Sequence, residues 1–392
     1  METNQFSKIK VEKVNDLHFL CNYENGSIVY LEEQYLDEVN SFLQDQSIEN
    51  LSEGTKNVLA ECGFFDEADK VIGQAYIHVT DRCNMDCIGC YSRTSLRNVR
   101  KDMDLDDIKK VLNQLKKHNI FRIVISGGEP LMRKDISEII EYAKGIGFEV
   151  AMISNGSYLI PGETMKNLDY LSFSVDVLDE RKNCLNRVMC KENLIKNLET
   201  AKEYQVYVNG IVTINAFNID TIDQYFAMKE LYDLPITFSI FHATDEVSKP
   251  FLLKDEQLRK LVDQCVGELP ELIEGFSSFD DIYCRENCGA GKCNISVDAS
   301  GNLSPCHMLH NINIGNLLDD EEKAWDDLDK FWKSLCTPSE CAGCDYYAFC
   351  GAGCKARSLL TGDGKGKDPY CEMYRYYYEK QYRYIKDVLI AN

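Results

Sequence analysis

Three cysteines stand close together in the segment DRCNMDCIGCYSRT, residues 81–94, directly after the apolar run AYIHVT. Cys83, Cys87 and Cys90 are separated by three and then two residues. Thiolates bind soft metals, and both zinc and iron–sulfur clusters take cysteine ligands. A structural zinc site needs four protein ligands, and this segment has no fourth cysteine or histidine. The spacing therefore favours a four-iron cluster with one iron open to another ligand, with zinc as the alternative.

A second group of cysteines lies toward the C-terminal end of the chain. Its members are Cys288, Cys293, Cys306, Cys341, Cys344, Cys350, Cys354 and Cys371. The two groups together hold eleven of the eighteen cysteines. A chain of 392 residues with no apolar leader favours metal binding over the disulfide framework of a small secreted protein. Short-gapped cysteine pairs also suit a zinc ribbon, which stays open as an alternative.

The composition excludes some partners. A formal net charge of −21 argues against nucleic acid, because phosphate binding needs clustered Lys and Arg. The N-terminal sequence METNQFSKIK is not a secretion signal, and no uninterrupted apolar run is long enough to cross a bilayer. We therefore expect a soluble cytoplasmic protein with no nucleic-acid or membrane partner.

Residues 1–72 read as a small separate unit. KIKVEKV, LHFLCNY and SIVYLE alternate like three short strands, and EQYLDEVNSFLQ and LSEGTKNVLAECGFF carry apolar residues at helical spacing. Three strands followed by helices predict a winged-helix-like module.

Residues 73–280 alternate between strand and helix patterns. The expected strands are 75–80, 121–126, 149–154, 170–175, 206–214 and 235–240, with amphipathic helices between them. Such alternation predicts an α/β fold with a parallel sheet, and six units predict a partial (β/α)6 TIM-like barrel. Functional residues of such sheets lie at the C-terminal ends of strands, where the first cysteine group stands.

Residues 281–392 lose this periodicity. Cysteines, glycines and turn residues dominate, so we expect little regular structure and a fold that depends on bound metal. The final segment EMYRYYYEKQYRYIKDVLI predicts an aromatic-rich helix that serves packing.

Polar motifs end three of the expected strands. SGGEP, Ser126 to Pro130, follows the second strand, SNGS, Ser154 to Ser157, ends the third, and Ser174 and Asp176 end the fourth. The glycines of SGGEP allow close backbone approach, and its glutamate can accept hydrogen bonds from an ammonium group.

CNMDCIGCY resembles the CxxxCxxC signature of the radical S-adenosylmethionine (SAM) enzymes, with Tyr91 in the aromatic place after the third cysteine. The resemblance implies that the open iron binds SAM and that SAM is cleaved to a 5′-deoxyadenosyl radical. The residues that correspond to the family's GGEP motif are Gly127, Gly128, Glu129 and Pro130. In that family this motif contacts the amino group of the SAM methionine.

The resemblance also implies further SAM contacts. Ser154, Asn155, Ser174 and Asp176 correspond to positions that reach the ribose and methionine, and Arg187 resembles an arginine that pairs with the SAM carboxylate. A plain strand-end turn is the alternative for Asn155 and Ser174.

The second cysteine group resembles the seven-cysteine pattern of the SPASM extension, whose members usually carry two auxiliary four-iron clusters. By that resemblance, auxiliary cluster I is held by Cys288, Cys306 and Cys354. Auxiliary cluster II is held by Cys341, Cys344, Cys350 and Cys371. For the fourth ligand of cluster I we expect Cys293, with Cys284 or an open iron as alternatives. The chain is thus expected to hold three [4Fe–4S] clusters and SAM.

Residues 1–72 resemble the PqqD-like peptide-recognition domain of SPASM peptide maturases. This implies an enzyme that cross-links a precursor peptide, most readily through a cysteine thioether, with an external flavodoxin or ferredoxin as electron donor. The first alternative is an anaerobic sulfatase-maturing enzyme, which forms formylglycine and has an aspartate base where this chain has His307. His307 is therefore a candidate catalytic base. A non-enzymatic electron carrier is the last alternative.

Overall fold

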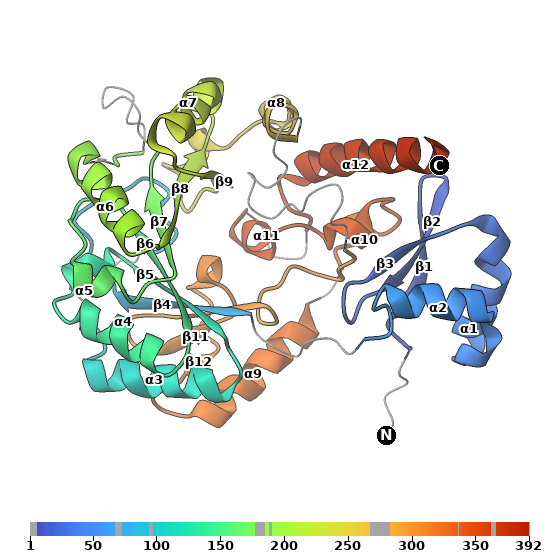
Figure 1. Ribbon diagram of the computed structural model, residues 1–392, viewed down its shortest axis with the longest axis horizontal. Helices are drawn as coiled ribbons and strands as arrows, with labels where there is room; N and C mark the ends of the chain where they lie inside the picture. Colours follow the sequence, from blue (N-terminus) through green and yellow to red (C-terminus); the bar gives the residue numbers. More distant parts are fainter. Residues whose placement is uncertain are drawn as a thin grey trace.

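The computed structural model describes residues 6–66, 73–93, 97–99, 101–176, 185–187, 190–266, 283–335, 337–361 and 366–391. Its parallel sheet and flanking helices form one half of the molecule, and the N-terminal sheet lies at the opposite end (Figure 1). The C-terminal region lies between them. The two expected domain boundaries fall in 67–72 and 267–282, outside the described residues.

The N-terminal unit has the predicted elements. Its strands β1, β2 and β3 form an antiparallel sheet in that order. Their bounds are Ile9–Val14, Leu17–Asn22 and Ile28–Leu31, and the helices are α1, Leu36–Asp45, and α2, Glu53–Glu61. Ser52 caps α2 by accepting a hydrogen bond from the Thr55 amide at 3.3 Å. Phe42 and Leu59 bury one face of the sheet under these helices.

The N-terminal unit packs against the rest of the molecule. Strand β2 is buried on both faces: Leu20 packs with the helices, whereas Phe19 belongs to the core of the rest of the molecule. The rings of Phe19 and Phe349 lie 5.6 Å apart, and Asn15 donates to the Tyr346 hydroxyl at 3.2 Å. The N-terminal unit therefore shares a hydrophobic core with the C-terminal region.

The barrel sheet confirms the predicted parallel strands. The nine-stranded order is β12-β11-β10-β4-β5-β6-β7-β8-β9, and β4 to β9 run parallel. These six strands are Gln74–Thr80, Arg122–Gly127, Glu149–Ser154, Tyr170–Ser174, Tyr207–Ile214 and Ile236–Ile240. The helices are α3, Leu105–Lys117; α4, Ile136–Gly145; α5, Gly162–Met165; α6, Lys191–Glu203; α7, Ile222–Tyr232; and α8, Asp255–Val266.

The two faces of this sheet differ in chemistry. Ile77 and Ile125 belong to one hydrophobic cluster with α3 residues such as Leu112. Because side chains alternate along a strand, His78 and Ser126 face the opposite side, where they are register neighbours. The inner face thus carries polar groups suited to a ligand.

The C-terminal region holds more regular structure than the sequence indicated. Strand β10, Asn294–Val297, pairs in parallel with β4, and β11, Asn302–Ser304, and β12, Gly315–Asn316, extend the sheet. The helices are α9, Glu321–Ser334; α10, Tyr347–Cys350; α11, Lys355–Thr361; and α12, Cys371–Ala391. Helix α9 escaped prediction although Ala324 and Leu328 are buried at helical spacing and Asp320 caps it. Helix α12 is the predicted aromatic helix.

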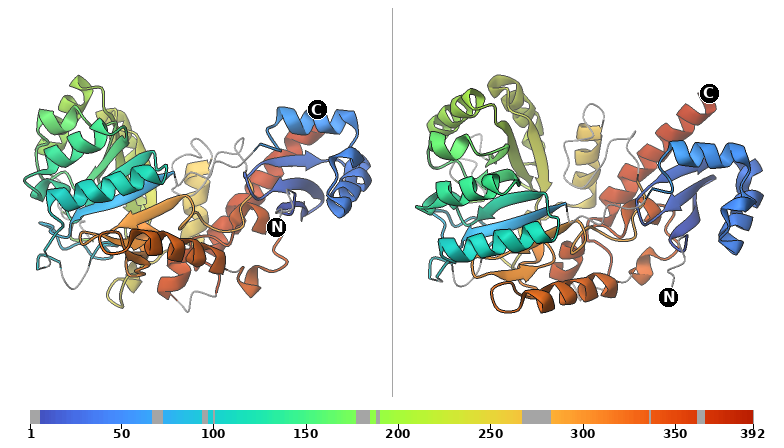
Figure 2. Two further views of the ribbon diagram at one scale, coloured as in Figure 1. Left: turned by 90° about the horizontal axis from the view of Figure 1, so that it is seen from below. Right: turned by 60° about the horizontal axis from the view of Figure 1, so that its bottom comes forward.

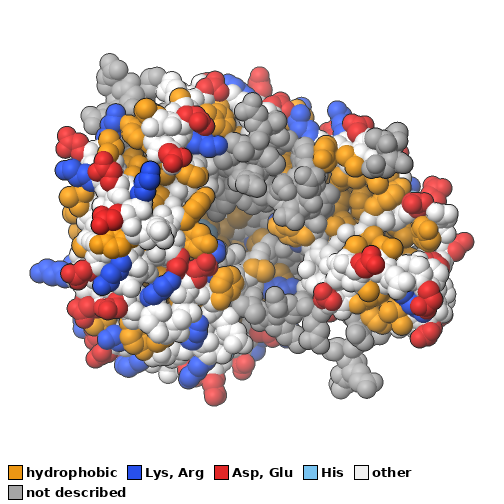
Figure 3. All heavy atoms as spheres, viewed as in Figure 1, with side chains coloured by type: hydrophobic (Ala, Val, Ile, Leu, Met, Phe, Trp, Pro, Cys, Tyr) orange, Lys and Arg blue, Asp and Glu red, His pale blue; other side chains and the backbone are white. Residues whose placement is uncertain are grey.

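Helix α12 joins the two halves of the molecule. It runs beside α8 and reaches the N-terminal sheet (Figures 1 and 2), where Lys386 pairs with Asp16 at 2.6 Å. Figure 3 shows charged side chains of both signs over the barrel helices. No helix within the described ranges is long and apolar enough to cross a membrane.

Candidate active site

The first cysteine group lies in the loop after β4, as predicted. Cys83 and Cys87 have pKa values raised by burial, and each is raised further by the neighbouring Cys90. Burial also opposes ionisation of Cys90, but Arg97 and Ser92 lower its pKa overall. The three thiols therefore influence one another's ionisation.

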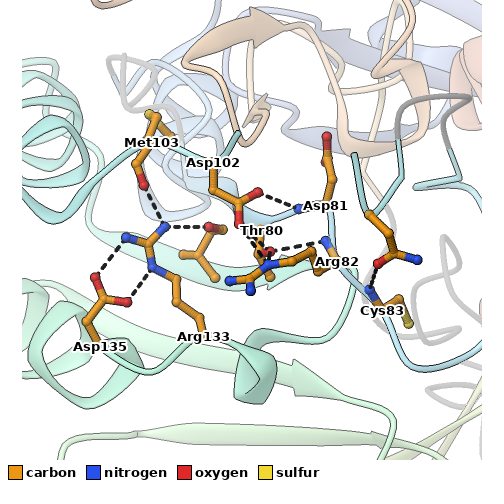
Figure 4. Close-up of polar contacts among 10 residues, drawn as sticks. Thr80, Asp81, Arg82, Cys83, Asp102, Met103, Arg133 and Asp135 are labelled. Carbon is orange, nitrogen blue, oxygen red and sulfur yellow. Dashed lines mark hydrogen bonds and ion pairs between the residues drawn. The ribbon is translucent and has the colours of Figure 1, made fainter. Parts of the chain in front are cut away.

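Asp102 holds the start of this loop (Figure 4). It accepts hydrogen bonds from the Thr80 hydroxyl at 2.7 Å and from the Asp81 amide at 3.1 Å, and its other contact is Arg82 Nε at 3.3 Å. The Cys83 amide donates to Asn98 Oδ1 at 3.1 Å. The start of the loop is thus held by contacts within the protein.

Arg133 contacts the backbone before and after the same loop. Its guanidinium donates to the carbonyls of Val79 and Met103 at 2.8 and 2.7 Å and pairs with Asp135 at 2.7 Å (Figure 4). Sequence reasoning missed Asp102 and Arg133 because no motif marks them.

Gly127 and Gly128 allow close backbone approach, here between two loops of the protein itself. Gly127 has φ +130°, and a Cβ atom on Gly128 would lie 2.0 Å from the Arg82 carbonyl oxygen. The Gly128 amide donates to the Thr80 carbonyl at 2.8 Å. The glycines let this loop pack against the cysteine loop, and Pro130 then starts a short 3₁₀ helix, Pro130–Met132.

Glu129 joins the second and third strand-end motifs. Its buried carboxylate accepts hydrogen bonds from the Leu131 amide at 3.1 Å, the Ser154 hydroxyl at 3.0 Å and the Asn155 amide at 2.8 Å. Burial raises its pKa, and these hydrogen bonds partly offset the shift. A carboxylate has about four acceptor sites, so one remains for an ammonium group such as that of SAM.

Asp176 and Arg187 form an ion pair with each other. Asp176 also accepts from the Thr213 amide, and Arg187 contacts the Thr213 hydroxyl at 3.3 Å. Burial opposes the charge of Arg187, but Asp176 raises its pKa overall. Burial raises the pKa of Cys87 and the charge of Arg187 partly offsets this shift, so Arg187 lies beside the first cysteine group. Ser174 is half-buried at the end of β7.

Tyr91 and His307 lie against each other. The Tyr91 hydroxyl is 3.0 Å from Ser126 Oγ, and the ring centroids of Tyr91 and His307 are 5.3 Å apart. His307 also stacks on Tyr76 at 4.1 Å, and its Nδ1 lies 3.8 Å from Cys306 Sγ. Burial lowers the His307 pKa to about 4. His307 therefore connects the first cysteine loop with the second cysteine group.

Two other histidines, His78 and His242, were missed. Both are buried, and each Nε2 atom has no hydrogen-bond partner in the described part of the chain. Burial lowers their pKa values to about 3 and about 4. The alternation of AYIHVT places His78 on the polar inner face and was a usable signal.

The expected ligands of auxiliary cluster I border one cavity of about 840 Å³. They are Cys288, Cys293, Cys306 and Cys354. The Cys293 amide donates to the Gly289 carbonyl at 2.7 Å, which places it in the same turn as Cys288. Cys284 also borders the cavity, but it is buried and its thiol donates to the Ser27 carbonyl at 3.4 Å. The geometry thus favours Cys293 over Cys284.

The four expected ligands of auxiliary cluster II line a second, more enclosed cavity. They are Cys341, Cys344, Cys350 and Cys371. No three metal-ligating side chains among the described residues converge on one metal ion. A zinc site would bring its sulfurs to about 3.8 Å from one another.

Comparison with known proteins agrees with this geometry. Residues 77–228 match the radical SAM superfamily. The chain is 25% identical over 320 residues to the mycofactocin maturase MftC of Mycolicibacterium smegmatis, covering 75% of this chain and 81% of the relative. It is 24% identical over 333 residues to an AdoMet-dependent heme synthase of Methanosarcina barkeri, with coverage of 75% and 94%.

Solved structures show the same fold. SuiB of Streptococcus suis superposes with a TM-score of 0.59 at 16% identity, covering 93% of this chain and 98% of SuiB. Native anSMEcpe with bound AdoMet gives a TM-score of 0.65 at 17% identity, with coverage of 80% and 98%. Together with the cysteine loop and the GGEP loop packed against it, the family match shows that residues 77–228 form a radical SAM domain.

Proposed function

We propose that this enzyme matures a ribosomally made precursor peptide by closing an intramolecular cross-link, a thioether from a cysteine sulfur to a carbon. The observation that carries the proposal is the course of the 840 Å³ cavity. It is lined by residues 23–27 and 62–63 of the N-terminal unit and by the cysteines of auxiliary cluster I. A peptide held by the N-terminal unit would therefore lie close to auxiliary cluster I.

The N-terminal unit suits peptide capture by strand addition. In the order β1-β2-β3, strand β3 is an edge strand, and its Tyr30 is 37% exposed. An extended peptide that adds to such an edge gains main-chain hydrogen bonds, and side-chain contacts give specificity. SuiB, which covers 93% of this chain, has also been solved with its precursor peptide SuiA.

The residues of the barrel bind and orient SAM in this proposal. Cys83, Cys87 and Cys90 hold its cluster, and Glu129 receives the methionine ammonium group. The Asp176–Arg187 pair lies near the C-terminal ends of the strands of the same sheet. When bound, SAM and its cluster supply a 5′-deoxyadenosyl radical, and two auxiliary clusters supply an electron acceptor. We infer three [4Fe–4S] clusters and reduction by an external flavodoxin- or ferredoxin-type donor.

The cross-linking reaction must balance in hydrogen atoms and electrons. Removing one hydrogen atom from a carbon and joining that carbon to a cysteine sulfur takes two hydrogens from the peptide. One leaves as the abstracted atom, and the other leaves as a proton and an electron. We assign the uptake of that proton to His307, which lies beside Cys306.

Sulfatase maturation is the second candidate, because anSMEcpe has the same fold. That structure covers 80% of this chain, whereas SuiB covers 93%. His307 stands where sulfatase-maturing enzymes are expected to carry aspartate. Both observations favour the peptide cross-linking assignment.

The test starts from short reading frames beside the gene. Each encoded peptide is titrated into reconstituted enzyme, and SAM cleavage is measured with and without it. The proposal expects one peptide to bind and to accelerate SAM cleavage, while a sulfatase peptide and small carboxylic acids do not. Acceleration by the sulfatase peptide or by a small acid alone would overturn it.

A further inference from the structure

We infer that Arg97 raises the reduction potential of the SAM cluster by placing its positive charge beside the cluster ligand Cys90. This inference concerns the cluster of the radical SAM domain and is independent of which substrate the enzyme modifies. Arg97 belongs to no motif noted in the sequence, and none of the SAM contacts above includes it.

The guanidinium of Arg97 lies over the cysteine loop. Nη2 is 3.3 Å from Cys90 Sγ and 3.0 Å from Ser92 Oγ, and Nη1 is 3.5 Å from the Met85 carbonyl oxygen. Ser92 in turn donates to the Gly127 carbonyl at 2.9 Å. One side chain therefore contacts a cluster ligand and, through Ser92, the loop after β5.

The same guanidinium keeps an unused donor. Arg97 Nε is buried and has no hydrogen-bond partner among the residues that the structure describes. Leaving a charged group's donor unsatisfied away from water is costly, so a buried donor of this kind indicates an acceptor that binds there. An anionic iron–sulfur cluster held by Cys90 provides such acceptors.

Electrostatics gives the direction of the effect. Adding an electron makes the cluster more negative, and a nearby cation stabilises the reduced form more than the oxidised form. Partial burial strengthens this interaction because the local dielectric is lower than that of water. Hydrogen bonds and charge near cluster sulfurs are recognised determinants of reduction potential. Arg97 therefore makes the cluster easier to reduce.

Arg93 is the matched control on the same loop. Its guanidinium pairs with Asp86 at 3.1 Å, at the surface, and its side chain is 45% exposed. Arg93→Gln removes one positive charge from the loop, as Arg97→Gln does, but the Arg93 side chain pairs with Asp86 and not with Cys90. Any difference between the two variants reflects the position of the charge.

The experiment is an EPR-monitored redox titration of the reconstituted holoenzyme. The SAM cluster is identified as the signal that changes when SAM is added. Arg97→Gln should shift the midpoint of that signal to more negative potential, Arg97→Lys should retain most of the wild-type value, and Arg93→Gln should match wild type. Iron content and the auxiliary signals report whether each variant is intact.

A fully loaded Arg97→Gln enzyme with the wild-type midpoint would overturn the inference, and so would an equal shift in Arg93→Gln. If Arg97→Gln does not retain the cluster, Arg97→Met serves as the second charge-removing variant, because its unbranched side chain fills part of the same space without a charge. A negative shift of the midpoint in Arg97→Met supports the role of Arg97, and an unchanged midpoint contradicts it. Neither outcome depends on a peptide substrate.

Discussion

Gly128 packs so closely against Arg82 that a Cβ atom at position 128 would lie 2.0 Å from the Arg82 carbonyl oxygen. The Glu129 amide donates to that same oxygen at 2.8 Å. The loop that carries Glu129 and the loop that carries the cluster cysteines are therefore built as one unit. A substitution that moves one of the two loops should therefore displace the other.

Gly128→Ala tests this coupling. The added methyl group must push the two loops apart, at a cost of about 1–3 kcal/mol typical of overpacking. We expect a large loss of SAM affinity and of iron from the first cluster, measured by calorimetry and iron analysis. Gly145→Ala is the control, because no atom lies within 4 Å of the added Cβ and α4 should tolerate it. Equal SAM affinity and iron content in the two variants would contradict the coupling.

Glu129 should give SAM binding a distinctive pH dependence. Its pKa is raised by burial, and only the charged carboxylate attracts an ammonium group. As pH falls through this raised pKa, the carboxylate becomes protonated and SAM affinity decreases. This loss occurs at a higher pH than the pH at which an exposed glutamate would become protonated. Glu129→Gln should bind SAM more weakly, by about tenfold or more for a lost charged hydrogen bond, and should lose this acid limb. Glu138 is exposed, and the Glu138→Gln variant should retain both the SAM affinity and the acid limb of the wild-type enzyme. An unchanged acid limb in Glu129→Gln would show that Glu129 does not take part in SAM recognition.

Cys293 and Cys284 can be separated by iron content. Cys293 lies in the turn that follows Cys288, whereas the Cys284 thiol is directed to the Ser27 carbonyl. We expect Cys293→Ser to alter the EPR signal of auxiliary cluster I or to lower the iron content. Cys284→Ser should keep the full iron content, although it removes a buried contact with the N-terminal unit. The opposite pattern would assign the fourth ligand to Cys284.

The edge strand of the N-terminal unit gives a cleaner test of peptide capture than deletion does. Removing residues 1–72 would expose the core around Phe349, so a loss of activity would have two causes. Tyr30→Asp changes an exposed side chain on β3 and should weaken peptide binding about tenfold or more, as expected for an aromatic contact. Tyr35→Asp, also exposed but outside β3, is the control. If both variants bind alike, the peptide uses another surface.

The sequence predicted the barrel well because its strands alternate with long amphipathic helices. It also placed Cys83, Glu129 and Asn155 at strand ends, where the structure brings the second and third motifs together through hydrogen bonds to Glu129. The local sequence pattern was sufficient to predict the structure of these regions.

Other features depend on contacts between distant segments. The pairing of β10 with β4, the shared core of Phe19 and Phe349, and the support of the cysteine loop by Arg133 join residues far apart in the chain. Backbone carbonyls accept the Arg133 hydrogen bonds, so no residue type marks the partner. Such relationships leave no local signal in one sequence.

The central claim is that this enzyme cross-links a peptide, and the mass of the peptide tests it most directly. The precursor peptide is incubated anaerobically with reconstituted enzyme, SAM and a reductant, and the product is analysed by mass spectrometry before and after alkylation of free thiols. We predict a product two hydrogens lighter, one cysteine resistant to alkylation, and one 5′-deoxyadenosine formed for each bond. An unchanged peptide mass, or formylglycine formed in a sulfatase peptide, would contradict the proposed function.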